Sequence, residues 1–175
     1  AVSHISEDDV RKLYDLRDVL DTRAAALAAE HVNAAQRANT AAGVSAATFT
    51  QLARSFADTA QELSAEHTAH PGYYELIDQL DAAIDHAADN PYLTQAQASV
   101  RLRLARVRRL STSNPDRLIA AANEHRAISE AIASGSPQLA IATTRVHLSN
   151  ALKNALASKE LTRQAEEKRH LSAAS

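Results

Sequence analysis

The sequence predicts an all-α protein that folds as an antiparallel helical bundle. Hydrophobic residues, mainly Ala and Leu, make up 45% of the 175 residues, and the chain has only 3 Gly, 4 Pro and 3% aromatic residues. This composition favours helices and leaves little material for β-sheets. Apolar residues also recur at helical spacing, and short segments containing Pro, Gly or Asn separate these stretches.

The first half of the chain is expected to contain three helices. The segment Ser6-Glu7-Asp8-Asp9 resembles a capping box and begins a long first helix. Residues 32–45 are small and polar, so most of them are expected to form a loop or a frayed helix end. A second helix covers about residues 46–67, and a third follows Pro71-Gly72. The inward stripes of these helices are Leu13, Leu16, Leu20, Ala24 and Leu27, then Phe49, Leu52, Phe56 and Leu63, then Ile77, Leu80, Ile84 and Ala88.

Three more helices are expected in the second half, each beginning at a proline. Asn90-Pro91 starts the fourth, and Asn114-Pro115-Asp116 starts the fifth with an Asn cap and Pro at the first helical position. Ser134-Gly135-Ser136-Pro137 ends the fifth and starts the sixth. Short breaks between long amphipathic helices make neighbours antiparallel. Residues 158–175 are charged and rich in Ala and Ser, which indicates an exposed helical extension or a disordered tail.

Composition also limits the function classes. The formal net charge of −2 gives the chain no basic footprint for nucleic acid. Without cysteine there are no disulfides, no thiolate catalysis and no Cys-type zinc site. No apolar run approaches 18 residues and no signal peptide is evident, so we expect a cytoplasmic protein with no membrane contact. The chain contains no Met and starts with Ala1, which fits a fragment of a longer protein or removal of an initiator Met.

Two histidines are the strongest candidates for a functional site. If the last two helices fold back on each other around Ser136, residues equally far from it in sequence face each other. His125 and His147 satisfy this condition. Two facing imidazoles in a helical protein suggest a metal site, an anion site or a polar pocket. A hydrogen-bonded core role for each histidine is the alternative.

Charged residues on the other helices are expected to reach the same interior. Asp81 shares the apolar stripe of the third helix, and it lies as far before the Asn90-Pro91 break as Val100 lies after it. The third and fourth helices are therefore expected to form a hairpin with Asp81 opposite Val100 or Arg101, where a structural ion pair is the alternative role. Arg17 lies on the inward face of the first helix. We expect a solvated face for Arg103, Arg106, Arg108 and Arg109, solvent exposure for Asp78 and Asp85, and no role for His31, His67, His70 and His86.

Several motifs, in order along the chain, resemble the C-terminal effector domain of FadR-type GntR regulators, known as the FCD domain. The resemblance covers about residues 13–156. It rests on Leu13-Tyr14-Asp15-Leu16-Arg17, Leu20-Asp21, Leu27-Ala28-Ala29, Ala87-Ala88-Asp89-Asn90-Pro91-Tyr92-Leu93, Arg106-Val107-Arg108-Arg109-Leu110-Ser111, Glu124-His125-Arg126-Ala127-Ile128 and Val146-His147-Leu148. The resemblance implies a bundle of six or seven helices that dimerises and binds a small carboxylate, often through a metal held by one Asp and three His.

The resemblance also assigns residues to that site. His125 and His147 match the two late histidines of the family. Counting back from Pro91, the family's early His falls at Asp81 and its Asp falls at Ile77, which cannot ligate. The expected metal ligands are therefore Asp81, His125 and His147, and the expected metal is zinc or nickel. The competing expectation is a metal-free pocket in which the histidines, Arg17 and Arg101 hold the carboxylate directly.

The expected organisation has an effector-binding and dimerisation domain in residues 1–157 and a polar extension in residues 158–175. The family's winged-helix domain, which would contact DNA, is expected to precede this region and is not found in the sequence. Two other function classes are alternatives: a metal-dependent enzyme and a structural dimerisation module with a filled core. The sequence has no HExxH, no Gly-x-Ser-x-Gly and no phosphate-binding loop, so we expect no enzyme.

Overall fold

The computed structural model describes residues 5–40, 46–66, 71–110 and 114–173, and this part of the chain forms six helices. The prediction of an all-α bundle is confirmed, and the helix starts at Pro71, Pro91, Pro115 and Pro137 agree with the expected breaks. The helices are α1 (Glu7–Ala38), α2 (Ala46–Glu66), α3 (Pro71–Ala88), α4 (Pro91–Leu110), α5 (Pro115–Ala133) and α6 (Pro137–Ala173).

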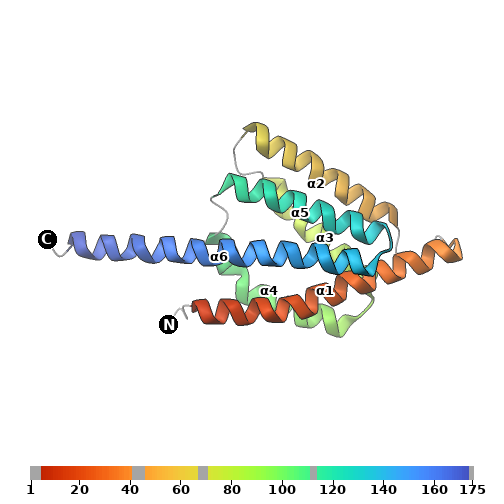
Figure 1. Cartoon of the computed structure of the whole chain (residues 1–175), viewed down its shortest axis with the longest axis horizontal. Coiled ribbons are helices and arrows are strands. Elements are labelled where there is room, and N and C mark those ends of the chain that lie inside the picture. Colours follow the sequence, from red (N-terminus) through yellow and green to blue (C-terminus); the bar gives the residue numbers. More distant parts are fainter. Residues whose placement is uncertain (1–4, 41–45, 67–70, 111–113, 174–175) are drawn as a thin grey trace.

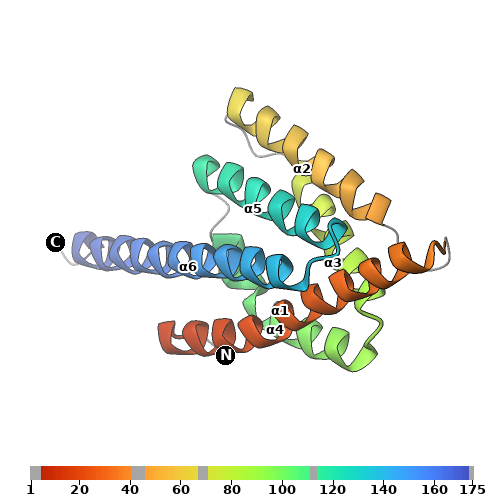
Figure 2. The same ribbon diagram turned by 45° about the vertical axis from the view of Figure 1, so that its right-hand side comes forward.

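The helices form two layers. In Figures 1 and 2, α2, α5, α6 and α1 lie side by side in that order, and α3 and α4 lie behind them. The closest packing within the first layer is between α2 and α5, α1 and α6, and α5 and α6. The C-terminal part of α6 extends beyond the bundle, and the side chains of residues 161–169 are mostly exposed (Figure 1). Of the two alternatives for this segment, the helical extension is therefore the one observed as far as Ala173.

Side-chain caps fix four of the expected helix starts, at Ser6, Asn90, Asn114 and Ser136. Ser6 Oγ accepts a hydrogen bond from the Asp9 backbone N–H (3.0 Å), while the Asp9 carboxylate accepts one from the Ser6 backbone N–H (3.1 Å). This reciprocal pair completes the capping box. Asn114 Oδ1 accepts from the backbone N–H of Asp116 (3.1 Å) at the start of α5. The turn between α5 and α6 contains Gly135 at φ +70°, where an added Cβ would lie 2.9 Å from Asn33 Cβ.

The structure corrects three expectations. Residues 32–38, expected to be mainly loop or frayed end, continue α1, which ends at Asn39 in the left-handed region (φ 48°). Leu16, placed on the inward stripe, is 46% exposed, whereas Tyr14 is buried. Finally, α3 and α4 do not form a packed hairpin, because both pack mainly against α1 rather than against each other.

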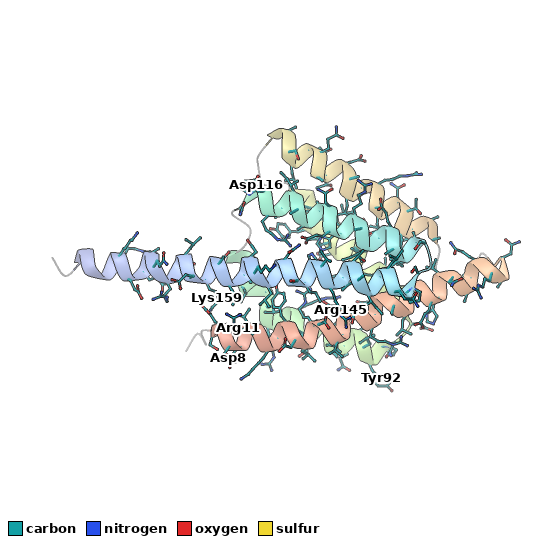
Figure 3. All side chains as sticks on the ribbon, viewed as in Figure 1. Asp8, Arg11, Tyr92, Asp116, Arg145 and Lys159 are labelled. Carbon is teal, nitrogen blue, oxygen red and sulfur yellow. The ribbon has the colours of Figure 1, made fainter. Side chains whose placement is uncertain are left out.

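The buried residues form two clusters. The larger joins α1, α2, α3 and α5 around Phe49, Phe56 and Leu80, and the smaller joins the first half of α1 to α4 and α6 around Val10 and Leu104. On the outside, Arg145, which Figure 3 labels between the ribbons of α6 and α1, donates to Asp18 of α1 (3.1 Å). Lys159 contacts the Ile5 carbonyl and ties the extension of α6 to the start of the chain. Within the described segments, no helix is both long enough and apolar enough to cross a membrane.

Candidate functional site

A cavity of about 140 Å³ lies where the two buried clusters meet. Five helices line it, and residues of both clusters contribute, including Tyr14 and Leu148 from the smaller and Leu80 and Ile128 from the larger. All of the residues expected at the site line this cavity, although they come from five different helices. These are Arg17, Asp81, Arg101, His125 and His147.

The two histidines meet as their positions on the hairpin predict. The ring centroids of His125 and His147 are 4.3 Å apart, with the planes at 47°. His125 is only 8% exposed, and its ring stacks on Phe56 at a centroid distance of 5.2 Å. Its Nδ1 lies 3.2 Å from the hydroxyl oxygen of Tyr73. His125 is therefore both a packed core residue and part of the cavity wall.

His147 is held by a carboxylate behind it. Its Nδ1 donates to Glu124 Oε2 (2.7 Å). Glu124 also accepts two parallel hydrogen bonds from Arg117 (2.8 and 2.7 Å) and one from Asn150 (2.8 Å). Burial alone would raise the pKa of Glu124, but these donors lower it to about 2. Each oxygen of the charged Glu124 carboxylate thus accepts two hydrogen bonds, and this carboxylate fixes the orientation of the His147 ring.

The protonation of His147 follows from its surroundings. Burial lowers the pKa of His147, and the hydrogen bond to Glu124 only partly opposes this effect. The ring is therefore neutral near pH 7, with its proton on Nδ1 because Glu124 is an acceptor. The opposite nitrogen, Nε2, is left as a hydrogen-bond acceptor.

Arg17 is the cation with the most remaining donor capacity. Its side chain is 13% exposed, and Nε donates to Asp21 Oδ2 (3.0 Å), with the guanidinium carbon 5.1 Å from the centre of the Tyr14 ring. Burial by itself would lower the pKa of Arg17, but the carboxylates of Asp21 and Asp81 raise it. Among the described residues, no hydrogen bond is observed at its two Nη groups.

Asp81 and Arg101 lie opposite each other, as expected, and form an ion pair. Arg101 Nη2 is 3.4 Å from Asp81 Oδ1, and its Nη1 is 3.6 Å from Asp85 Oδ2. Asp85, expected in solvent, is therefore half-buried and paired. The structural ion pair considered as the alternative role for these residues is what the structure shows.

The arrangement does not fit the expected three-ligand metal centre. Of the described His, Asp and Glu side chains, no three are placed to hold one metal ion. Asp81 lies against the guanidinium of Arg101 instead of joining the imidazoles. Metal-bound histidines often have a carboxylate hydrogen-bonded to the other ring nitrogen, as His147 has in Glu124. The two imidazoles of His125 and His147 alone, however, are too few ligands for a zinc site.

Residues outside the cavity agree largely with expectation. Asp78, His86 and Arg103 are exposed. His31, expected to have no partner, contacts the Ala87 carbonyl oxygen through Nδ1 at 2.7 Å and joins α1 to the end of α3. His67 and His70 lie outside the described residues, and the expectations for Arg106, Arg108 and Arg109 concern side chains that the structure does not describe.

Several polar residues of the site were not expected from the sequence. Glu124 is one residue away from the position that exactly mirrors His147 across Ser136, so the hairpin argument that paired the histidines also places Glu124 near His147. Arg117 lies two helical turns before Glu124 on the same face of α5. Gln97 and Thr144 also line the cavity. No pairing rule in the sequence identifies Gln97 or Thr144 as part of the site.

The family model described as the FCD domain matches residues 12–150, and the chain belongs to the FCD domain family. This family is the C-terminal effector-binding domain of GntR/FadR-type regulators, so the chain contains a regulator's effector-binding domain. No curated protein and no solved structure matches the chain.

Proposed function

We propose that this domain senses a small organic acid, which protein side chains bind directly in the cavity without a metal. The single observation that carries the proposal is the convergence of Arg17, His125 and His147 on one cavity inside an effector-binding domain. Buried polar groups around a concave, mostly apolar space are the usual form of a small-molecule site.

Arg17 is the proposed anchor for the carboxylate. Its two Nη groups form a planar fork that matches the two oxygens of a carboxylate, and charge-assisted hydrogen bonds of this kind are stronger than neutral ones. The other two arginines of the cavity are less available, because Arg117 is held by Glu124 and Arg101 spans Asp81 and Asp85. We therefore propose that Arg101 attracts the carboxylate through its charge without a direct hydrogen bond. His147 is proposed to accept a hydrogen bond from the ligand at Nε2.

The size of the cavity limits the ligand. At about 140 Å³ it is close to an apolar cavity of about 150 Å³ that holds benzene. An acid with about five to seven non-hydrogen atoms therefore fits without expansion of the bundle. Larger sugar acids or fatty acyl groups would require the helices to move apart.

Position in the fold suggests how binding is transmitted. The cavity lies between two buried clusters, one containing the first half of α1 with α4 and α6, the other containing α2, α3 and α5. A ligand that contacts both changes their relative packing only if it binds one arrangement more tightly than the other. We propose that this shift biases the geometry of a dimer and of the DNA-binding domains attached to it.

Exposed apolar side chains support dimerisation through the outer face of α1 and α6. Leu16 and Val19 on α1 are 46% and 64% exposed, and Val146 and Leu139 on α6 are 57% and 54% exposed. These two helices pack together, so the four side chains lie on neighbouring elements. We propose this surface as the contact between two copies of the domain.

The alternatives have less support. A purely structural module would need a filled core, whereas the described helices enclose a cavity lined by charged and polar groups. An enzyme would need an activated water or nucleophile beside a general base. Asp81 is paired with Arg101, and Glu124 is saturated by donors, so neither carboxylate is placed as a base.

A thermal-shift screen of small organic acids tests the proposal. An acid at a hundredfold its Kd stabilises the domain by about 2.7 kcal/mol, which raises the Tm by about 5 to 11 °C for a chain of this size. The variant Arg17→Gln should lose this shift. Arg23→Gln is the matched control, because Arg23 is an exposed arginine on the same helix, paired with Glu30. Loss of the shift in both variants or in neither would contradict the role of Arg17.

A further inference from the structure

Two polar groups in the wall of the cavity have no hydrogen-bond partner among the described residues. Gln97 is 3% exposed and Thr144 is 5% exposed, and both line the cavity. The side-chain oxygens Gln97 Oε1 and Thr144 Oγ1 are buried, and neither forms a hydrogen bond within the described part of the chain. Buried polar atoms without partners are uncommon in folded proteins, so each such atom needs an explanation.

The orientation of Gln97 is fixed by its other end. Its amide nitrogen Nε2 donates to Asp21 Oδ1 (2.9 Å), and the second oxygen of Asp21 accepts from Arg17. Turning the amide over would place its oxygen against a carboxylate oxygen, which cannot donate. Oε1 is therefore the end without a partner. Because it only accepts, it requires a hydrogen from an O–H or N–H group.

Thr144 differs from several other helical threonines. Thr22, Thr59 and Thr143 each donate to the carbonyl four residues earlier, which satisfies the hydroxyl within the helix. Thr144 makes no such bond, although Thr143 beside it does. Thr144 also lies one turn before His147 on the cavity face of α6. Its hydroxyl is thus a donor and acceptor held in the wall without a partner from its own helix.

We propose that Thr144 and Gln97 determine ligand specificity by requiring a hydroxyl group on the acid. This inference rests on the proposed acid-binding function of the cavity. Arg17 takes the carboxylate, and a hydroxyl elsewhere on the ligand donates to Gln97 or exchanges a hydrogen bond with Thr144. An acid without a hydroxyl fills the same space but leaves both oxygens unpaired, because its carboxylate has no hydrogen to give and its chain has no polar group.

The expected preference follows from the effect of one unpaired buried group. Leaving such a group without a partner weakens binding by about 5- to 150-fold. A hydroxy acid should therefore bind about 5- to 150-fold more tightly than the same acid without its hydroxyl. In the ligand-free domain, the buried oxygens Gln97 Oε1 and Thr144 Oγ1 lower the free energy of unfolding, because they lose their hydrogen bonds to water on folding. Removing one of them should leave the Tm unchanged or raise it, whereas loss of a purely structural hydrogen bond would lower it.

The test is calorimetric titration of the purified chain with matched pairs of acids. Each pair has three or four carbons and differs by one hydroxyl, as propanoate and 2-hydroxypropanoate do. The variant Thr144→Val keeps the side-chain shape and removes the hydroxyl, while Thr144→Ser keeps the hydroxyl. Thr143→Val is the matched control, since its hydroxyl already bonds to the Leu139 carbonyl (2.8 Å).

We expect Thr144→Val to reduce the preference for the hydroxy acid by about fivefold or more, with little change for the plain acid and no fall in the ligand-free Tm. Thr144→Ser and Thr143→Val should keep the preference. Equal binding of the two acids by the wild type, or an unchanged preference in Thr144→Val, overturns the inference and leaves acid sensing intact. If no acid of either kind binds, the proposed function fails as well.

Discussion

Replacing Glu124 by Gln removes the charge on which Arg117, His147 and Asn150 converge, without a large change in shape. The folded-state pKa of Glu124 is about 2, compared with 4.5 for an ordinary Glu carboxyl. This difference corresponds to about 3 kcal/mol of stability when the carboxyl is ionised in both states. Breaking a buried charge pair by removing one partner has a similar effect, about 3 to 5 kcal/mol.

The pH dependence has a definite sign. Because the folded-state pKa is the lower one, the unfolded chain takes up the proton first as the pH falls. The contribution of Glu124 is therefore complete above about pH 5, falls to less than half by pH 3 and is lost below about pH 2. The wild type and Glu124→Gln should differ most at pH 7 and converge in acid.

Urea unfolding followed by circular dichroism at several pH values measures both effects. At pH 7 we expect Glu124→Gln to lose about 3 kcal/mol, or about 6 to 12 °C in Tm. Glu130→Gln is the control on the same helix, where an exposed pair with Arg126 should contribute less than about 1 kcal/mol. A loss no greater than that of the control, or one that does not shrink between pH 6 and pH 3, would refute the reasoning.

Four further predictions concern the site and the fold. His125→Ala should abolish the acid-induced thermal shift while the helix content stays the same, whereas His86→Ala, on the exposed face of α3, should keep the shift. Dialysis against a chelator should change acid affinity by less than about twofold, because Arg17 and not a metal holds the carboxylate; rescue of lost binding by zinc or nickel would contradict this. Val19→Lys should yield monomers in light scattering if α1 and α6 form the dimer surface, while Leu102→Lys on α4 should not. Gly135→Ala should lower the free energy of unfolding by about 1 to 3 kcal/mol in urea melts, since its φ is positive and its Cβ would crowd Asn33; an unchanged value would contradict that crowding.

Sequence reasoning identified the helices well because each break carries its own local chemistry. The starts at Pro91, Pro115 and Pro137 depend on proline and its capping neighbours, which act within a few residues. The error at residues 32–38 came from reading small side chains as a loop, although alanine is the strongest helix former. Nothing local to that segment shows that Val32 is buried against other helices.

The sequence predicts the candidate site only where two helices fold back at a recognisable turn, because residues equally far from that turn then face each other. The turn at Ser136 sets the register of α5 against α6, which brings His125 to His147. The hairpin argument is weaker for Asp81 and Arg101, because α3 and α4 pack mainly on α1 rather than on each other. The long Arg101 side chain nevertheless reaches Asp81. The hydrogen bonds that link Arg17 and Gln97 through Asp21 depend on how α4 crosses α1. Helical periodicity within one segment contains no information about that crossing.

The most direct test of the central claim is an NMR titration of the domain with the tightest-binding acid, following the ring carbon-bound protons of its histidines. Resonances of His125 and His147 should shift together and saturably, and those of His86 should stay in place, because only the first two line the cavity. Shifts confined to His86, or none at either cavity histidine while the acid binds, would place the ligand elsewhere and contradict the account.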